Sequence, residues 1–276
     1  MSERHRANHQ HLSPAPLPAA TAPATGRQIN AVVNPRILTA TTGRILRQLR
    51  HDPRTIGLLI GVPVVLMGLV YAMYDGSPQV GQILLIMLGI FPFVIMFLIT
   101  SIAMLRERTS GTLERLMTTR TGKGDLLFGY GIAFGTTAAG QAVVAAACAY
   151  WLYSMITAGS AGLVVLIAVL TALLGVGLGL ACSALARTEF QAVQMLPVVV
   201  IPQILLCGLF VPRDEMAGWL SALSDVMPLS YAVEALQEVG ANSEPTSTFW
   251  IDLVVVGGCV ILGLILAAVT LRRRTP

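Results

Sequence analysis

Few residues of this chain have the types and spacing that catalysis needs. The four histidines, His5, His9, His11 and His51, all precede the first long apolar run. A Ser–His nucleophile or a histidine–zinc site within the apolar part of the chain is therefore excluded. There is no GxxxxGK[ST] motif, and residues 122–124 (Gly-Lys-Gly) predict a turn with a lysine and not a phosphate cradle. The sequence predicts no catalytic residue and no ATPase machinery in this chain.

Cysteine and glycine patterns also lack the spacing of a cofactor site. The cysteines all lie in apolar runs and form no CxxC pair, which indicates small buried hydrophobes and not a zinc or disulfide framework: Cys148, Cys182, Cys207 and Cys259. Gly175, Gly177 and Gly179 lie in an apolar run with no strand before them, so they predict close helix packing and not dinucleotide binding. We expect no metal and no cofactor bound to this chain.

The apolar runs must position whatever site the chain has. Of its 276 residues 55% are hydrophobic and 12% charged, about half the charge density of a soluble domain. A bilayer core about 30 Å thick needs roughly 20 apolar residues in a helix. Six runs are long enough: residues 56–74, 83–105, 126–156, 163–186, 192–211 and 249–271. Residues 126–186 contain no charge at all, whereas ion-coupled carriers keep ionisable groups in their spans, so energy for transport would enter from another chain.

The cations are sorted to one side of these six runs. They precede the first run, lie between runs two and three and between four and five, and follow the sixth, while the other side receives only Arg213. The positive-inside rule therefore places both termini in the cytoplasm and supports an even number of spans. Residues 1–33, rich in proline and polar residues, predict a disordered cytoplasmic tail, with the membrane domain over residues 34–274.

Two segments outside the runs have amphipathic patterns. Residues 36–50 place Leu38, Ile45 and Leu49 on one face and arginines, including Arg44 and Arg47, on another. This pattern is typical of a helix in the headgroup plane, or of a cytoplasmic helix packed on protein. On the opposite side, residues 212–248 are acidic, and Pro228 is expected to divide them into two short helices.

The second of these short helices would carry Tyr231, Glu234 and Glu238 on one face by i, i+3 and i+7 spacing. The two carboxylates would bind a cationic substrate or line an exit gate, or they are simply solvated. Gln203, like Gln141 and Gln194, lies inside a run and would face a substrate path or bond across helices.

The loop after the second run carries the most specific pattern. Leu113, Leu116 and Met117 form an i, i+3, i+4 apolar patch on a short charged helix, which fits a groove on a partner protein or packs on its own bundle. Residues 107–117 resemble the E-x-x-x-G-T-L-E-R-L signature of bacterial permeases of type-2 ATP-binding-cassette (ABC) transporters. Residues 206–236 resemble the same family's span-five exit and P-x-x-Y-A-x-x-A-L segment. The resemblance covers about residues 36–274.

Two departures from the family pattern accompany these matches. Thr119 and Arg120 stand where relatives often have proline, and Gly129 and Tyr130 stand where relatives often have Gly-Lys. The departures leave the expected fold intact.

The resemblance implies an all-α membrane protein with six transmembrane helices, an N-terminal interfacial elbow helix, a cytoplasmic coupling helix and short re-entrant helices before the last span. The coupling residues would be Glu107, Gly111, Thr112, Leu113, Glu114, Arg115, Leu116 and Met117. They would contact a separate ABC ATPase that binds ATP and magnesium. Tyr231, Glu234, Glu238 and Gln203 would belong to the exit gate or path.

The implied function is ATP-driven export of a drug, lipid or other amphipathic molecule across the bacterial inner membrane. A second permease, identical or related, would complete the transporter, and no nucleic acid partner is expected. The alternative is a subunit of the same fold that senses or assembles a complex without transport. An ion channel would need a polar filter, which the sequence does not contain.

Overall fold

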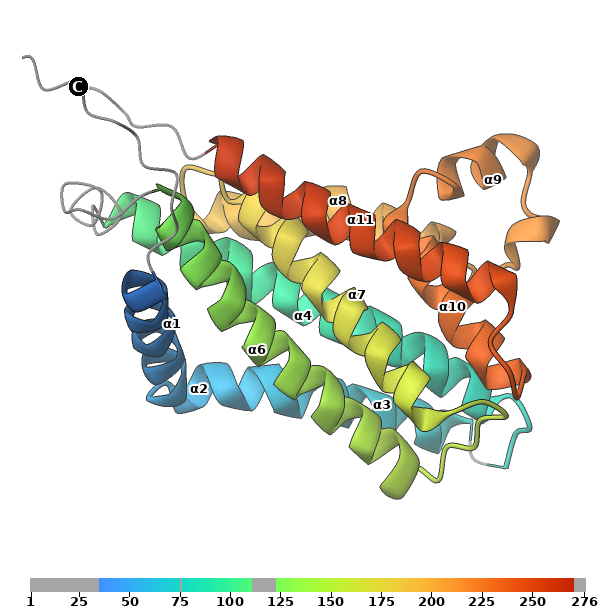
Figure 1. Cartoon of the computed structure of the whole chain (residues 1–276). Coiled ribbons are helices and arrows are strands. Elements are labelled where there is room, and N and C mark those ends of the chain that lie inside the picture. Colours follow the sequence, from blue (N-terminus) through green and yellow to red (C-terminus); the bar gives the residue numbers. More distant parts are fainter. Residues whose placement is uncertain (1–34, 75, 111–122, 271–276) are drawn as a thin grey trace, which may run out of the picture. The chain divides into compact units, whose positions relative to one another are not determined.

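The structure is a computed structural model, which describes residues 35–74, 76–110 and 123–270. These residues form helices and connecting loops (Figure 1). Six helical segments are long and apolar enough to cross a membrane: Pro53–Met73, Val80–Thr109, Phe128–Trp151, Ala161–Cys182, Glu189–Leu206 and Ser247–Thr270. The predicted number of spans is thus confirmed for the described residues. The predicted tail, the 111–117 helix and the last six residues lie outside them.

All six spans end at other residues than predicted, and two of them end five residues early, which is the largest difference. α6 (Lys123–Trp151) ends five residues before the predicted end at 156, because the chain turns at Ser154, whose φ is 49°. α8 (Glu189–Leu206) also ends early, because the chain turns at Gly208, whose φ of 89° suits glycine. Apolar residues continue beyond both helix ends, so a prediction based on hydropathy alone placed the ends of these spans too far along the chain.

The first span consists of three helical pieces, α2 (Pro53–Ile56), the π-helical η1 (Gly57–Gly61) and α3 (Val62–Met73). Pro63 has no N–H, so the Leu59 carbonyl four residues earlier lacks its usual helical donor. The buried Gln141 side chain of α6 supplies one, with Nε2 donating to Leu59 O at 2.9 Å. The expectation that Gln141 bonds across helices is confirmed.

α4 (Val80–Thr109) and α7 (Ala161–Cys182) pack closely through glycine. A Cβ atom on Gly179 would lie 2.6 Å from Phe97 O, and one on Gly175 would collide with Phe93 O. On another face of α7, Gly177 lies against Gly263 of α11 (Ser247–Thr270). The absence of a Cβ atom on both glycines lets α7 and α11 approach closely. The predicted role of the α7 glycines in helix packing is confirmed.

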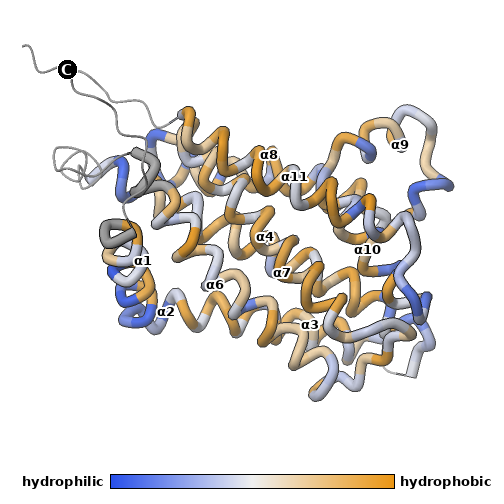
Figure 2. The backbone as a smooth tube through the Cα atoms, in the orientation of Figure 1, coloured by the Kyte–Doolittle hydropathy of each residue, from blue (hydrophilic) through white to orange (hydrophobic). Residues whose placement is uncertain are grey.

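The segment before the first span forms α1 (Pro35–Arg50), a helix as the sequence predicts. It packs on α6, where Thr42 Oγ1 donates to Gly129 O at 3.2 Å and Ile45 is buried. Arg47 is exposed, but Arg44 turns toward protein groups instead of remaining with Arg47 on a purely polar face. Apolar residues dominate the long helices and polar residues their ends (Figure 2).

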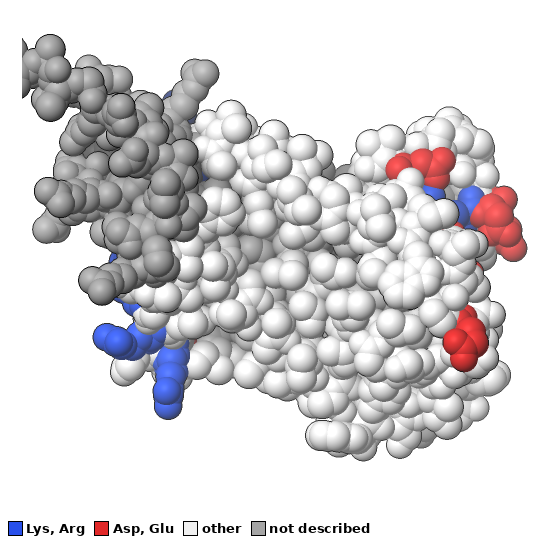
Figure 3. Space-filling view, in the orientation of Figure 1, with Lys and Arg blue, Asp and Glu red and all other residues white. Residues whose placement is uncertain are grey.

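The segment before the last span contains η2 (Arg213–Glu215), α9 (Gly218–Ser224) and α10 (Pro228–Ala241). Pro228 occupies the first turn of α10, where its missing N–H is tolerated, so the predicted division into two short helices is confirmed. α10 packs against α4, with Leu236 lying over Gly89. Basic side chains gather at the α1 end and acidic side chains around α9 and α10 (Figure 3).

Candidate functional site

The predicted coupling residues 111–117 lie outside the described residues, but both flanks of their segment are described. α4 ends at Thr109, and α6 begins at Lys123. Glu107, the first of the predicted coupling residues, lies in the last turn of α4. The structure therefore shows how the segment is attached to the membrane helices.

Arg44 of α1 connects both flanks. Its Nη2 atom lies 3.3 Å from Glu107 Oε1 and donates to the Tyr130 hydroxyl of α6 at 2.8 Å. The Glu107 side chain is 13% exposed and Tyr130 is buried, so water screens these contacts less than surface ion pairs. We call Arg44, Glu107 and Tyr130 the α1–α4–α6 cluster. It joins three helices where the predicted coupling segment leaves and re-enters the bundle.

A second contact connects the end of α4 to the start of α8. Arg106 donates from Nε and Nη2 to the two carboxylate oxygens of Glu189, at 2.7 and 3.0 Å. Both side chains are more than half exposed, so solvent screening leaves the pair only a small contribution to stability. Its bidentate geometry fixes relative orientation more than it stabilises the fold.

A cavity of about 520 Å³ lies beside the α1–α4–α6 cluster, with Ile45, Leu98 and Phe134 among its apolar lining residues. Asp52, at its polar edge, caps the first span by accepting from the backbone N–H groups of Arg54 and Thr55. The hydrogen bond from the Thr55 hydroxyl, at 2.6 Å, is the main cause that lowers the pKa of Asp52. Asp52 is therefore a charged cap at neutral pH.

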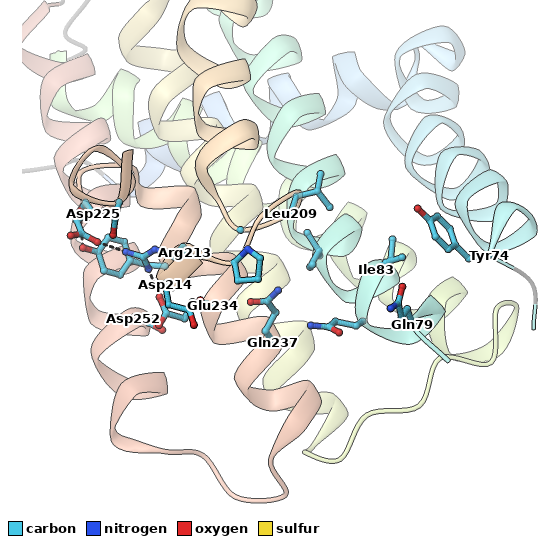
Figure 4. A pocket seen from close by; sticks show the side chains of 16 residues that line it. Tyr74, Gln79, Ile83, Leu209, Arg213, Asp214, Asp225, Glu234, Gln237 and Asp252 are labelled. Carbon is cyan, nitrogen blue, oxygen red and sulfur yellow. Dashed lines mark hydrogen bonds and ion pairs between the residues drawn. The ribbon is translucent and has the colours of Figure 1, made fainter. Parts of the chain in front are cut away.

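The other end of the helices contains a larger cavity, of about 810 Å³ (Figure 4). We call it the α9–α10 cavity. Its lining residues come from the α3–α4 turn, α4, the segment after α8, α9, α10 and α11: Tyr74, Gln79, Gln82, Ile83, Ile86, Gly208, Leu209, Pro212, Arg213, Asp214, Ser221, Asp225, Tyr231, Glu234, Gln237 and Asp252.

Arg213 organises one side of this cavity. Its guanidinium forms ion pairs with Glu234 of α10 and Asp225 at the end of α9, and lies 5.2 Å from the centre of the Tyr231 ring. Tyr231 donates from its hydroxyl to the Asp225 carbonyl at 2.7 Å. The segment after α8, the end of α9 and α10 are thereby held together (Figure 4).

Two of the four predicted gate residues line the cavity and two do not. Tyr231 and Glu234 lie together on it. Glu238 instead accepts from Asn242 Nδ2 at 3.1 Å and from the Thr246 hydroxyl at 2.8 Å, which fastens the loop after α10. Gln203 donates to Val199 O of its own helix at 3.0 Å.

Arg213 and Asp252 are cavity residues that the sequence predictions omitted. The sequence contains a signal for each of them. Arg213 is the sole cation on the acidic side of the spans, and Asp252 is the only acidic residue in the last apolar run. Asp252 lies in the second turn of α11 and is only 3% exposed. Among the described residues its Oδ2 atom has no hydrogen-bond partner.

The sequence of this chain is similar to that of a known protein family and of several transport proteins. The family described as ABC-2 type transporter matches residues 36–239. The chain is 29% identical over 156 residues to the probable multidrug ABC transporter permease YbhR of Escherichia coli (strain K12), covering 56% of this chain and 42% of that protein. It is 26% identical over 166 residues to the linearmycin resistance permease protein LnrN of Bacillus subtilis (strain 168), covering 60% and 41%.

A eukaryotic relative is similar over a comparable stretch. The chain is 24% identical over 178 residues to ABC transporter G family member 20 of Dictyostelium discoideum, covering 64% of this chain and 24% of that protein. The chain thus spans less than half the length of each of these relatives. Together, the family match over most of the helices and the six candidate spans confirm the resemblance seen in residues 107–117 and 206–236. The chain is a multi-pass membrane protein of the ABC-2 type transporter family.

Proposed function

We propose that this chain is the membrane-spanning permease subunit of an ATP-driven exporter, with ATP and magnesium bound by a separate ABC ATPase. The observation that carries the proposal is the α1–α4–α6 cluster. It fastens Glu107 and Tyr130, on either side of the 111–122 segment, to Arg44 of α1. A displacement of that segment by a partner would therefore move α1, α4 and α6 together, as rigid-body switching between packed states requires.

The contact with the ATPase is assigned to residues 111–117. Leu113, Leu116 and Met117 supply the apolar face of the coupling helix, and Glu114 and Arg115 its polar contacts. Glu107 contributes by a different route, since its carboxylate pairs with Arg44 of the same chain. Gly111 and Thr112 would form the start of the docked helix.

The charge distribution supports the proposed orientation. Basic side chains gather at the α1 end, which would face the cytoplasm of a bacterial cell with both termini, while the mainly acidic α9–α10 end would face outward (Figure 3). α1 would then be the elbow helix in the inner headgroup layer, and α9 and α10 would be re-entrant helices of the outer leaflet.

A complete transporter would contain two permeases, identical or related, and two ATPases. Large apolar side chains are exposed along the last span, among them Val254, Ile261 and Leu262. In this arrangement such faces contact lipid or the second permease. The substrate would pass between the permeases, and the residues that hold α9 and α10, chiefly Tyr231 and Glu234 with Arg213, would gate its exit.

The proposed substrate class is a drug, lipid or other amphipathic molecule. The apolar spans support it, as do the names of two relatives, a probable multidrug permease and a linearmycin resistance permease. A subunit that senses or assembles without transport remains the alternative, because the cluster could transmit a signal by the same contacts.

Reconstituted vesicles separate these two functions. The permease and an ABC ATPase that co-purifies with it would be placed in proteoliposomes loaded with amphipathic dyes or fluorescent lipids. The proposal predicts ATP-dependent movement of at least one of these molecules, and none with an ATPase whose Walker lysine is replaced. ATP hydrolysis that responds to the permease without movement of any probe would favour the sensing function.

A further inference from the structure

The α9–α10 cavity carries more acidic than basic groups. Among the residues that the structure describes, four carboxyl side chains line it, those of Asp214, Asp225, Glu234 and Asp252, with the single guanidinium of Arg213. Arg213 is already bound to Asp225 and Glu234. Neither Asp214 nor Asp252 forms an ion pair with a described residue. The cavity therefore attracts positive charge.

Asp252 differs from Asp214 in its surroundings. Asp214 is exposed to solvent, whereas Asp252 is 3% exposed and lies among the apolar residues of α11. Its Oδ2 atom has no hydrogen-bond partner among the described residues, although the side chain lines the cavity. Figure 4 draws Asp252 next to Glu234, below the Arg213 guanidinium. A buried carboxylate without a partner is unfavourable, and a cation in the cavity would supply both charge and donor.

The cavity walls indicate an organic cation and not a metal ion. In the part of the chain that the structure describes, no three His, Cys, Asp or Glu residues are grouped as metal ligands would be. The volume of about 810 Å³ is that of a site for a drug-sized molecule, roughly 300 to 1,000 Å³. Ile83, Ile86 and Leu209 are apolar lining residues, which would suit the body of an amphipathic ligand.

We propose that Asp252 binds the ammonium group of a cationic amphipathic molecule in the α9–α10 cavity, with the apolar part of that molecule along Ile83, Ile86 and Leu209. The inference deepens the proposed function and rests on it, because the bound molecule would be an exported substrate near its exit. Glu234, whose carboxylate forms an ion pair with Arg213, adds negative charge beside the ammonium group.

Binding to the full chain in lipid nanodiscs tests this inference without the ATPase. The probes are a dansylated alkyl diamine and its N-acetylated counterpart, which differ in the ammonium charge. We expect the wild-type chain to bind the amine about tenfold more tightly than the acetylated probe, as for loss of a charged hydrogen bond. Asp252→Asn should abolish this selectivity, and the exposed Glu244→Gln, outside the cavity lining, should retain it.

Equal binding of the two probes by the wild-type chain would overturn the inference, even if Asp252→Asn cannot be purified. So would selectivity that persists in a folded Asp252→Asn variant. Gln237→Lys, which introduces a cation into the same cavity, is a second variant expected to remove selectivity. Selective binding without transport would contradict only the proposed function, and transport by a chain without ammonium selectivity would overturn only this inference.

Discussion

Arg44 of α1 lies 3.3 Å from the Glu107 carboxylate in the last turn of α4 and donates to Tyr130 of α6. One guanidinium thus connects the two helices that flank the predicted coupling segment. The sequence predicts for α1 either a position in the headgroup plane or packing on protein, and the contact gives this helix a mechanical connection to the spans. It also explains why Arg44 does not share the exposure of Arg47.

Loss of this connection is expected to uncouple transport from hydrolysis. Glu107→Gln removes the charge that pairs with Arg44 and keeps the size of the side chain. We expect ATP-dependent transport to fall severalfold while ATPase binding persists, because the docking residues are intact. The matched control is Glu189→Gln, which breaks the more exposed pair with Arg106. Equal losses in both variants would assign no special role to the α1–α4–α6 cluster.

The Gln141 side chain is expected to stabilise the broken first span. Gln141→Leu removes the donor to Leu59 O, which should lower the free energy of unfolding by about 1–2 kcal/mol. Thermal unfolding in detergent would measure the loss, with the exposed Gln194→Leu as the control. In a Pro63→Ala background the effect should shrink, since residue 63 then supplies an N–H to Leu59. An undiminished effect there would contradict this explanation.

Close packing of α4 and α7 predicts a large difference between two identical substitutions. Gly179→Ala would place a Cβ atom 2.6 Å from Phe97 O, whereas Gly258→Ala on α11 meets nothing within 4 Å. We expect Gly179→Ala to destabilise the protein by about 2 kcal/mol or more, and Gly258→Ala to be neutral or stabilising. Thermal unfolding of the two variants would compare them, and equal unfolding temperatures would rule out the α4–α7 contact.

The proposed orientation can be tested with single engineered thiols in a chain whose four cysteines are replaced. Asn242→Cys, after α10, should react with an impermeant maleimide in intact cells, because the acidic side would face outward. Arg187→Cys, between α7 and α8, should react only after the cells are opened. Labelling of both positions from the same side would contradict the sorting of charges on which the orientation depends.

Much of the fold was predictable from the sequence, because a span of lipid requires a long apolar run and the runs are unmistakable. Pro228 likewise predicted where the acidic segment divides, since proline ends one helix and begins another. The site contacts were not predictable. Arg213 and Glu234 are 21 residues apart, and Arg44 and Tyr130 are 86 apart. Such pairs follow from how helices pack, which no local pattern encodes.

The most direct test of the account concerns the segment between α4 and α6. Leu113→Asp combined with Leu116→Asp would place two charges on the apolar face assigned to the ATPase groove. The account predicts that the double variant inserts its six spans but no longer co-purifies with the ATPase and transports nothing. The control Thr119→Asp, in the same segment, should still co-purify with the ATPase and transport substrate. Co-purification of the double variant at the wild-type level would contradict it.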